Sequence, residues 1–214
     1  MNLLIFSDSH LTHVYDERKF QFLHRIISAS DRVVINGDFW DGYLTTFDKF
    51  IRSPWNRLFP LLLTKKAIHI YGNHDSPDLS DVRASLFSTQ QHDQIKIKSG
   101  DILLRIEHGQ EIYKLSDKSI PRFLRSPGTK LHSLVRRLHF RINSRGFAAF
   151  YRRPNRHFKK ISKTLNREVL IVGHSHGAEL SLSENLVNSG FIDWGFGSYI
   201  ICENGKIELR VENY

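Results

Sequence analysis

The stretch VLIVGHSHG, residues 169–177, joins four apolar residues to two histidines that have a glycine on either side. A short apolar run rich in β-branched residues is typical of a strand buried on both faces. In an open α/β sheet, ligands bind outside the carboxyl ends of the strands, which is where His174 and His176 would lie. Histidines in such a loop are either ordinary polar residues or ligands. The other strands of the chain bear on that choice.

Other apolar runs of the chain end in the same way. NLLIF (2–6) is followed by SDSH, RVVI (32–35) by NGDFWDG, AIHIY (67–71) by GNHD, and ILLRIE (102–107) by HG. Taken singly, each loop is explained by turn chemistry, because Asp, Asn and Gly are common in turns. Five such loops, each directly after a strand, are hard to obtain by accident. We therefore expect one site at one edge of the sheet, formed by Asp8, His10, Asp38, Asp41, Asn73, His74, Asp75, His108, His174 and His176.

The remaining apolar residues predict helices early in the chain and mostly strands late. ERKFQFLHRIISAS (17–30) has apolar residues at helical spacing, and IKIK (95–98) forms a hairpin pair with ILLRIE. SYIIC and KIELRV flank the turn ENGK (203–206) and read as a pair of closing strands. The order β-α-β-α-β followed by strands indicates an α/β fold without internal repeats.

Length and composition limit the class of protein. A chain of 214 residues suits one domain with a sizeable core, and 40% hydrophobic with 25% charged residues is typical of a globular protein. The single cysteine, Cys202, excludes an internal disulfide and favours a reducing compartment. The N-terminus lacks a basic n-region, and the longest apolar run, LFPLLL (58–63), is too short to span a bilayer. A cytoplasmic location is therefore expected.

The net charge of +9 is concentrated in one segment. Residues 111–167 contain sixteen Lys/Arg and two Asp/Glu, whereas the rest of the chain has fifteen Lys/Arg and twenty Asp/Glu. Within it, KLHSLVRRLHFRI (130–142) places apolar residues at helical spacing. We interpret 111–167 as a basic helical insertion, or cap, within a single domain that spans 1–214. It favours an anionic partner, the alternative being a solvated helical surface that happens to be basic.

The residue types at the strand ends indicate metal chemistry. Carboxylates, an amide oxygen and imidazoles suit Mn²⁺, Fe or Zn²⁺ better than Ca²⁺, which prefers an all-oxygen shell. The loops offer no thiolate, which argues against a structural zinc site. There are enough ligands for two divalent ions, with Mn²⁺ the expected metal and Fe or Zn²⁺ the alternatives. Two ions about 3.5–4 Å apart form the usual clamp for displacement at phosphorus.

The motifs occur in an order that is itself informative. They are D-x-H (Asp8, His10), G-D-x-x-D (37–41), G-N-H-D (72–75), H-G (108–109) and G-H-x-H (173–176). In this order they resemble the motifs of the calcineurin-like metallophosphoesterases, from Met1 to about Val211 without the basic insertion. The resemblance implies a four-layer α/β/β/α sandwich of two mixed sheets. It also implies hydrolysis of a phosphodiester or pyrophosphate bond, with a metal-bridging hydroxide attacking phosphorus.

The same resemblance implies a role for each site residue. One metal would be held by Asp8, His10, Asp38 and His176, and the second by Asp38, Asn73, His108 and His174, with Asp38 bridging. His74 would be the general acid for the leaving oxygen or would stabilise the transition state, and Asp75 would orient it. Asp41 would support the site without ligating a metal. His69 lies outside the motifs and is interpreted as structural.

The insertion bears on the substrate. Its position after His108 resembles the cap of the UDP-2,3-diacylglucosamine pyrophosphatases, although that group often has arginine at the position of His74. Mixed basic and aromatic residues suit an anionic membrane surface or lipid, and they also suit nucleic acid. A nucleotide-lipid is the leading interpretation for the anionic, phosphate-containing substrate, and a nucleic-acid or nucleotide phosphodiesterase is the second. The candidate substrate-binding residues are Arg136, Arg137, Arg152 and Arg153.

A third hypothesis is a non-catalytic scaffold on the same fold, as in the retromer subunit. Loss of the catalytic histidine marks that case, and here His74 and every metal position are intact. An enzyme is therefore favoured, and no obligate protein partner is inferred. If the cap binds lipid, the protein would lie at the inner face of the membrane.

Overall fold

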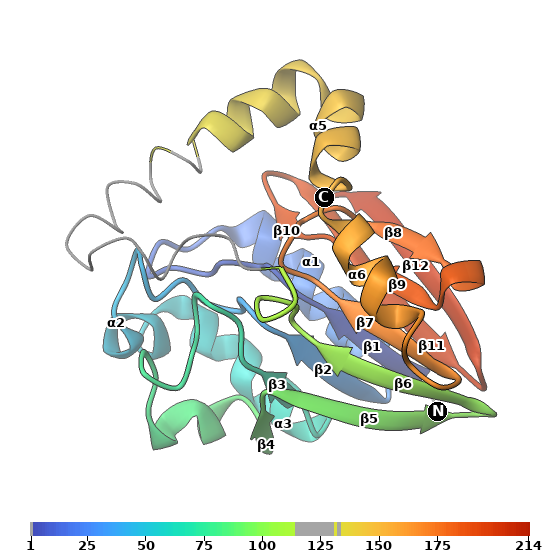
Figure 1. Ribbon diagram of the computed structural model, residues 1–214. Helices are drawn as coiled ribbons and strands as arrows, with labels where there is room; N and C mark the ends of the chain where they lie inside the picture. The colour runs from blue at the N-terminus through green and yellow to red at the C-terminus, as the bar shows by residue number, and fades with distance from the viewer. Residues whose placement is uncertain (1, 114–130, 132–133) are drawn as a thin grey trace.

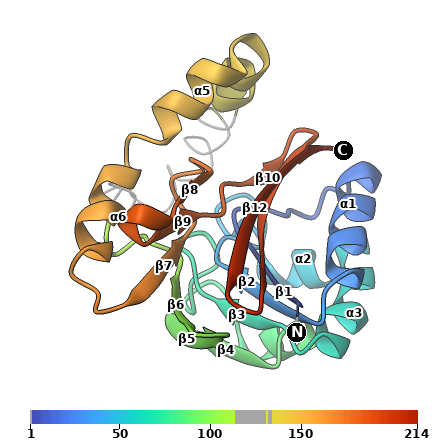
Figure 2. The same cartoon turned by 90° about the vertical axis from the view of Figure 1, so that its right-hand side faces the viewer.

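Two β-sheets stack face to face, and helices cover their outer faces (Figures 1 and 2). The structure is a computed structural model that describes residues 2–113, 131 and 134–214. The layers follow the order helix, sheet, sheet, helix, as the family resemblance implies, and both sheets are mixed.

The first sheet has a parallel centre and an antiparallel edge. Its strand order is β10-β11-β1-β2-β3-β4, and β12 pairs with β11. β1 to β4 run parallel, whereas β11 is antiparallel to β1 and to β12. The strands are β1 (Asn2–Phe6), β2 (Arg32–Asn36), β3 (Ile68–Ile70), β4 (Gln90–His92), β10 (Ile192–Asp193), β11 (Phe196–Glu203) and β12 (Lys206–Asn213).

The second sheet has the order β5-β6-β7-β9-β8. β5 and β6 form the predicted hairpin, and β7 runs parallel to both β6 and β9. The strands are β5 (Gln94–Ser99), β6 (Ile102–Glu107), β7 (Glu168–Val172), β8 (Glu179–Ser181) and β9 (Leu186–Asn188).

Alternate residues of each central strand enter different layers of the core. In β1, Leu3 and Ile5 pack between the two sheets, whereas Leu4 and Phe6 pack against the helices. In β7, residues 169 and 171 face the other sheet, and residues 170 and 172 face α6. Because successive side chains of a strand point to opposite faces, a strand buried on both faces must be apolar throughout. This is why the apolar runs of the sequence are continuous.

The helices on the first sheet are α1 (Glu17–Ser28), α2 (Phe47–Ile51) and α3 (Phe59–Thr64), with the 3₁₀ turns η1 (Pro54–Leu58) and η2 (Val82–Leu86). A further 3₁₀ turn, η4 (Leu182–Glu184), lies between β8 and β9. The start of α1 is fixed by Asp16, whose side chain accepts a hydrogen bond from the backbone N–H of Lys19 at 3.1 Å.

Among the described residues of the basic insertion, 134–142, 144–151 and 155–162 are helical, and these helices have two kinds of surroundings. A helix over residues 134–142 and α5 (Ser144–Tyr151) form an arm, by which we mean residues 134–151, and this arm projects beyond the sheets (Figures 1 and 2). The following helix, α6 (Asn155–Ser162), buries Phe158 against β7 and β9. Of the predicted insertion, 114–130, 132 and 133 lie outside the described residues.

Among the described residues, no helix has the length and apolar character that crossing a bilayer requires.

Candidate metal centre

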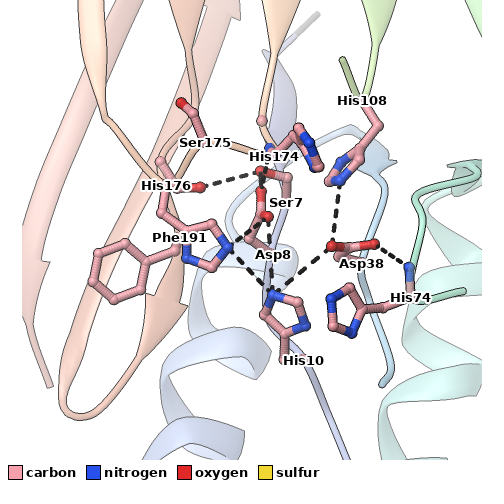
Figure 3. Close-up of polar contacts among 12 residues, drawn as sticks. Ser7, Asp8, His10, Asp38, His74, His108, His174, Ser175, His176 and Phe191 are labelled. Carbon is pink, nitrogen blue, oxygen red and sulfur yellow. Dashed lines mark hydrogen bonds and ion pairs between the residues drawn. The ribbon is translucent and has the colours of Figure 1, made fainter. Parts of the chain in front are cut away.

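The loops that follow β1, β2, β3, β6 and β7 meet at one edge of the sandwich (Figure 3). Backbone hydrogen bonds join them to one another. Asp8 N–H donates to the carbonyl of Gly37 at 3.0 Å, His10 N–H to that of Asp38 at 2.9 Å, and Gly173 N–H to that of His108 at 3.0 Å. The loops are therefore held in place by backbone contacts.

Backbone strain is concentrated at this edge. Ten non-glycine residues of the described chain have a positive φ, and five of them belong to the predicted site. These five are Asp8, His10, Asp38, His174 and His176. The left-handed region is unfavourable for residues with a Cβ, and strain of this kind clusters at functional sites. The conformation turns these side chains inward at the expense of local stability.

Two glycines of the motifs are required by close approach. A Cβ on Gly173 would lie 2.6 Å from Oδ2 of Asp8, and one on Gly72 would lie 2.6 Å from the backbone N of Asp38. Contacts this short do not occur for real Cβ atoms. The glycines before His174 and Asn73 therefore allow two loops to pack directly onto two carboxylates.

One group of side chains gathers around Asp8. Its Oδ1 lies 3.1 Å from Nε2 of His176 and 3.9 Å from Nε2 of His10, and the two imidazole Nε2 atoms are 3.4 Å apart. Its other oxygen accepts hydrogen bonds from Ser7 Oγ and from the backbone N–H of His174. Asp8, His10 and His176 thus point three potential ligand atoms at one point.

A second group gathers around Asp38. Oδ2 of Asp38 lies 3.3 Å from Nε2 of His108, and His174 completes the group. The backbone carbonyl of Asn36 accepts a hydrogen bond from Nδ1 of His108 at 2.8 Å, and the carbonyl of Tyr113 accepts one from Nε2 of His174 at 3.0 Å. Such bonds fix the tautomer of each imidazole and leave one ring nitrogen of each for a metal.

Asp38 also connects the two groups. Its Oδ2 lies 3.8 Å from Nε2 of His10, and a third cluster consists of His10, Asp38 and His74. The carboxylate of Asp38 therefore stands between the histidines of both groups (Figure 3). That is the position required of a carboxylate shared by two ions.

The electrostatics of the site depend on charges that are buried together. Burial raises the pKa of Asp38, but the imidazoles of His108 and His74 outweigh this and hold it well below the usual value. Burial lowers the pKa of His108, but the carboxylates of Asp38 and Asp8 raise it to about 10. Burial, aided by the neighbouring charge of His108, lowers the pKa of His174 to about 4. Burial also raises the pKa of Asp8, but His176 and His108 hold it well below the usual value, so both carboxylates are ionised.

These residues fit divalent metal ions. Oδ1 of Asp8 and Nε2 of His108 are buried and form no hydrogen bond within the described part of the chain. A buried polar atom without a hydrogen bond is costly, and a metal ion would satisfy both atoms. The mixture of imidazole and carboxylate suits a transition metal. Asn73 stands directly before His74 in the same loop, and its role as a ligand stays a prediction.

The partner of His74 differs from the predicted one. Oδ1 of Asp41 lies 3.0 Å from Nδ1 of His74, and Oδ2 of Asp41 lies 3.5 Å from Nδ1 of His10. The two oxygens of Asp75 are used elsewhere, by the backbone N–H groups of Phe39 and Gly72 and by the ring of His69.

The carboxylate beside Nδ1 of His74 is thus that of Asp41, and the role of Asp75 in orienting His74 stays a prediction. Asp75 is fully buried, and it accepts hydrogen bonds from the backbone N–H of Gly72 in its own loop and of Phe39 in the loop after β2. His69, interpreted as structural, is fully buried and lies 2.9 Å from this carboxylate.

Of the four arginines predicted to bind substrate, only Arg136 has a described contact with a predicted metal ligand. Its Nη2 contacts Nδ1 of His176. Arg137 is exposed, Arg152 donates through Nε to the carbonyl of Ala178 at 2.9 Å, and Arg153 lies over the ring of Phe150.

A buried polar network that supports the GHSH loop was not predicted. Asn188 Nδ2 donates to Oγ of Ser175 at 2.8 Å and to Oδ1 of Asn155 at 2.9 Å, and Asn155 Nδ2 donates to the carbonyl of Gly177. Asn155 comes from α6, inside the insertion. Three polar residues from distant parts of the sequence carry no common motif, so only the fold reveals their contact.

The chain is similar to several known proteins. The model of the calcineurin-like phosphoesterase family matches residues 1–178. An archaeal phosphodiesterase structure has 18% identity and a TM-score of 0.55, with both chains covered completely. The phosphoesterase YfcE of E. coli has 16% identity, a TM-score of 0.48 and coverage of 95% of this chain and 89% of its own. Zinc-complexed Vps29 of Entamoeba histolytica has 16% identity, a TM-score of 0.49 and coverage of 100% and 99%. A search of curated proteins gives no match.

Replacing Asp38 with asparagine should remove metal from both groups. The asparagine side chain keeps the size of aspartate and tolerates the positive φ, but an amide cannot carry the charge shared by two ions. We expect the metal content after desalting to fall from about two ions per molecule to below about one. Inductively coupled plasma mass spectrometry measures this, with Asp101→Asn, an exposed carboxylate in the β5–β6 turn, as the matched control. Unchanged metal content in Asp38→Asn would contradict the shared position.

Two single variants, Asp41→Asn and Asp75→Asn, should separate an effect on catalysis from an effect on stability. Asp75→Asn turns an amide N–H₂ toward donors that the carboxylate now accepts, so we expect the free energy of unfolding to fall by about 2–4 kcal/mol. Asp41→Asn should lower kcat on a generic diester by about tenfold or more, because His74 loses the carboxylate beside Nδ1. Urea denaturation and steady-state kinetics of both variants test this. A large kcat loss in Asp75→Asn at unchanged stability would restore the original assignment.

Proposed function

The chain belongs to the calcineurin-like phosphoesterase family, and we propose that it is a metal-dependent hydrolase of a phosphodiester or pyrophosphate bond. The observation that carries this proposal is the placement of Asp38 between two histidine groups, with the ring of His74 beside them. Two ions bound there would polarise the phosphoryl group and supply an activated water.

The chain's own residues supply the remaining chemistry. The carboxylate of Asp41, 3.0 Å from Nδ1 of His74, favours the tautomer that carries its proton on Nδ1, and it stabilises the imidazolium. In that arrangement Nε2 of His74 is the atom that exchanges a proton with the leaving oxygen. Asp8, His10, His108, His174 and His176 would hold the ions with Asp38 and Asn73.

A nucleotide-lipid such as UDP-2,3-diacylglucosamine is the substrate class that we favour. The support lies in the arm, whose exposed face combines aliphatic and basic side chains. The exposed apolar residues here, with the helical residue 131 just before the arm, are Leu131, Leu134, Val135, Leu138, Ile142 and Phe150, from 48% to 82% exposed. Residues 118–167 contain no Asp or Glu. An aliphatic face with basic flanks suits an anionic lipid surface.

The same arm gives less support to a nucleic-acid substrate. Binding of single strands depends on bases stacking on exposed aromatic rings. Phe147 is buried and packs edge-on or tilted against Phe140 and Tyr151, and of the arm's described aromatic side chains only Phe150 is exposed. The basic charge of the arm alone would attract the phosphates of a lipid and those of a nucleic acid alike. Nucleic acid is therefore the second candidate.

A scaffold function has the least support. The likeness to Vps29 lies below a TM-score of 0.5 and carries no argument about function. The chain keeps His74 and the seven predicted metal ligands.

The first test is ³¹P NMR of the Mn²⁺-loaded protein with UDP-2,3-diacylglucosamine. Hydrolysis of its P–O–P bond by water should give UMP and a lipid phosphomonoester. His74→Asn should lower the rate by about 100-fold or more, and Asp101→Asn should leave it unchanged. Cleavage of a generic diester without cleavage of the nucleotide-lipid would keep the phosphoesterase and refute this substrate class. If neither compound is cleaved, the proposed hydrolase activity is refuted.

The arm should bind anionic vesicles through its aliphatic face. We expect sedimentation with vesicles containing phosphatidylglycerol but not with pure phosphatidylcholine. Leu138→Glu combined with Ile142→Glu should weaken binding by about tenfold or more, because charge replaces buried apolar surface. Val82→Glu, at a site that is 89% exposed outside the arm, is the matched control. Tighter binding to a single-stranded oligonucleotide than to the vesicles would favour the nuclease instead.

A further inference from the structure

One cation of the arm enters the candidate metal centre. Arg136 lies in the helix over 134–142, and its Nη2 contacts Nδ1 of His176 and lies 3.3 Å from Nε2 of the same ring. Its Nε is buried and forms no hydrogen bond within the described residues. No carboxylate of the described chain forms an ion pair with it. A guanidinium with a buried, unsatisfied donor is therefore positioned beside the predicted ligands.

Two aromatic rings hold the guanidinium in this position. Its Cζ lies 5.6 Å from the ring centroid of Tyr151 in α5 and 5.3 Å from that of Trp194, between β10 and β11. Arginine stacks well on aromatic rings, and the contact is stronger where water is excluded. Because the rings come from different elements, they fix the guanidinium in place against both the arm and the sandwich.

The contact with His176 leaves the guanidinium available for a different acceptor. Arginine can only donate, so Nδ1 of His176 accepts here, and Nε2 of the same ring lies 3.1 Å from Oδ1 of Asp8. An imidazole that ligates a metal through Nε2 carries its proton on Nδ1 and cannot accept from arginine. With a metal on Nε2 of His176, the guanidinium of Arg136 would lose Nδ1 as its acceptor. A guanidinium in this position then requires an anionic acceptor. A planar guanidinium matches two phosphoryl oxygens.

We propose that Arg136 is the arm's phosphate-binding residue, which donates to the non-bridging oxygens of the phosphoryl group that is cleaved. The proposal rests on the proposed function and adds to it a residue of the insertion that acts directly at the metal centre. The other three predicted arginines have no such place. The arm then has two faces, one that binds the phosphoryl group and one that is exposed.

Binding of inorganic phosphate to the Mn²⁺-loaded protein tests this without hydrolysis. Isothermal titration calorimetry should show an affinity about 10- to 100-fold weaker in Arg136→Met, which keeps the length of the side chain and removes its donors. Arg136→Lys should recover only part of the loss, because ammonium lacks the planar fork. Arg137→Met changes the exposed neighbour on the same helix and should bind phosphate like the wild type. Metal content is measured for every variant.

Several results would overturn the proposal. They are unchanged affinity in Arg136→Met, equal losses at positions 136 and 137, loss of metal from Arg136→Met, or a wild type that binds no phosphate. The proposed function can fail separately. A wild type that binds phosphate through Arg136 but cleaves neither a diester nor a pyrophosphate would keep the binding residue and refute the hydrolase.

Discussion

Two ionised carboxylates, Asp8 and Asp38, are buried at the ends of neighbouring parallel strands, and the surrounding loops are organised around their charge. Taking a carboxylate out of water costs several kcal/mol unless donors or cations replace the water. Here the backbone N–H groups of His174 and His74 donate to the two carboxylates, at 3.0 and 2.9 Å. Since these donors come from loops after other strands, the charge of each carboxylate ties distant loops together. The close approach also explains the motif glycines and the strained backbone.

The sandwich is what allows five loops to share these carboxylates. β1 and β2 of one sheet and β6 and β7 of the other end at the same edge, so loops from both sheets face one another. The insertion between β6 and β7 uses the same arrangement. Its α6 contributes Asn155 to the network beneath the GHSH loop, and its arm brings Arg136 onto His176. A segment that the sequence separates from the core thus supports the candidate site from two directions.

The sequence predicts this protein well where local pattern and site chemistry coincide. Continuous apolar runs followed by polar loops predict the strands and the edge, because parallel strands ending together must bring those loops together. Prediction from the sequence fails where the hydrogen-bond partner of a side chain is a backbone group. The carbonyls of Asn36 and Tyr113 orient two histidines, and a carbonyl has no residue signature. Asp75 is next to His74 in the sequence, which suggested that the two side chains form a pair. In the structure, Asp75 accepts from backbone N–H groups, and Asp41, from another loop, lies beside the imidazole of His74. Likewise, four basic residues of the insertion look equivalent until the helix places only Arg136 inward.

The two faces of the arm follow from the period of its helix. Residues four apart lie on the same side, so Arg136 and Phe140 share the side that faces the sandwich, where Phe140 packs near Phe191, Trp194 and Phe196. Leu138 is two positions, and so about 200°, away from Arg136, and it lies with Leu134 and Ile142 on the exposed side. A surface helix with no further role would place polar residues there. Leucines in those positions are costly unless something covers them, and the unbroken positive charge around them favours an anionic surface. The helix thus places its exposed apolar face and its inward guanidinium on opposite sides.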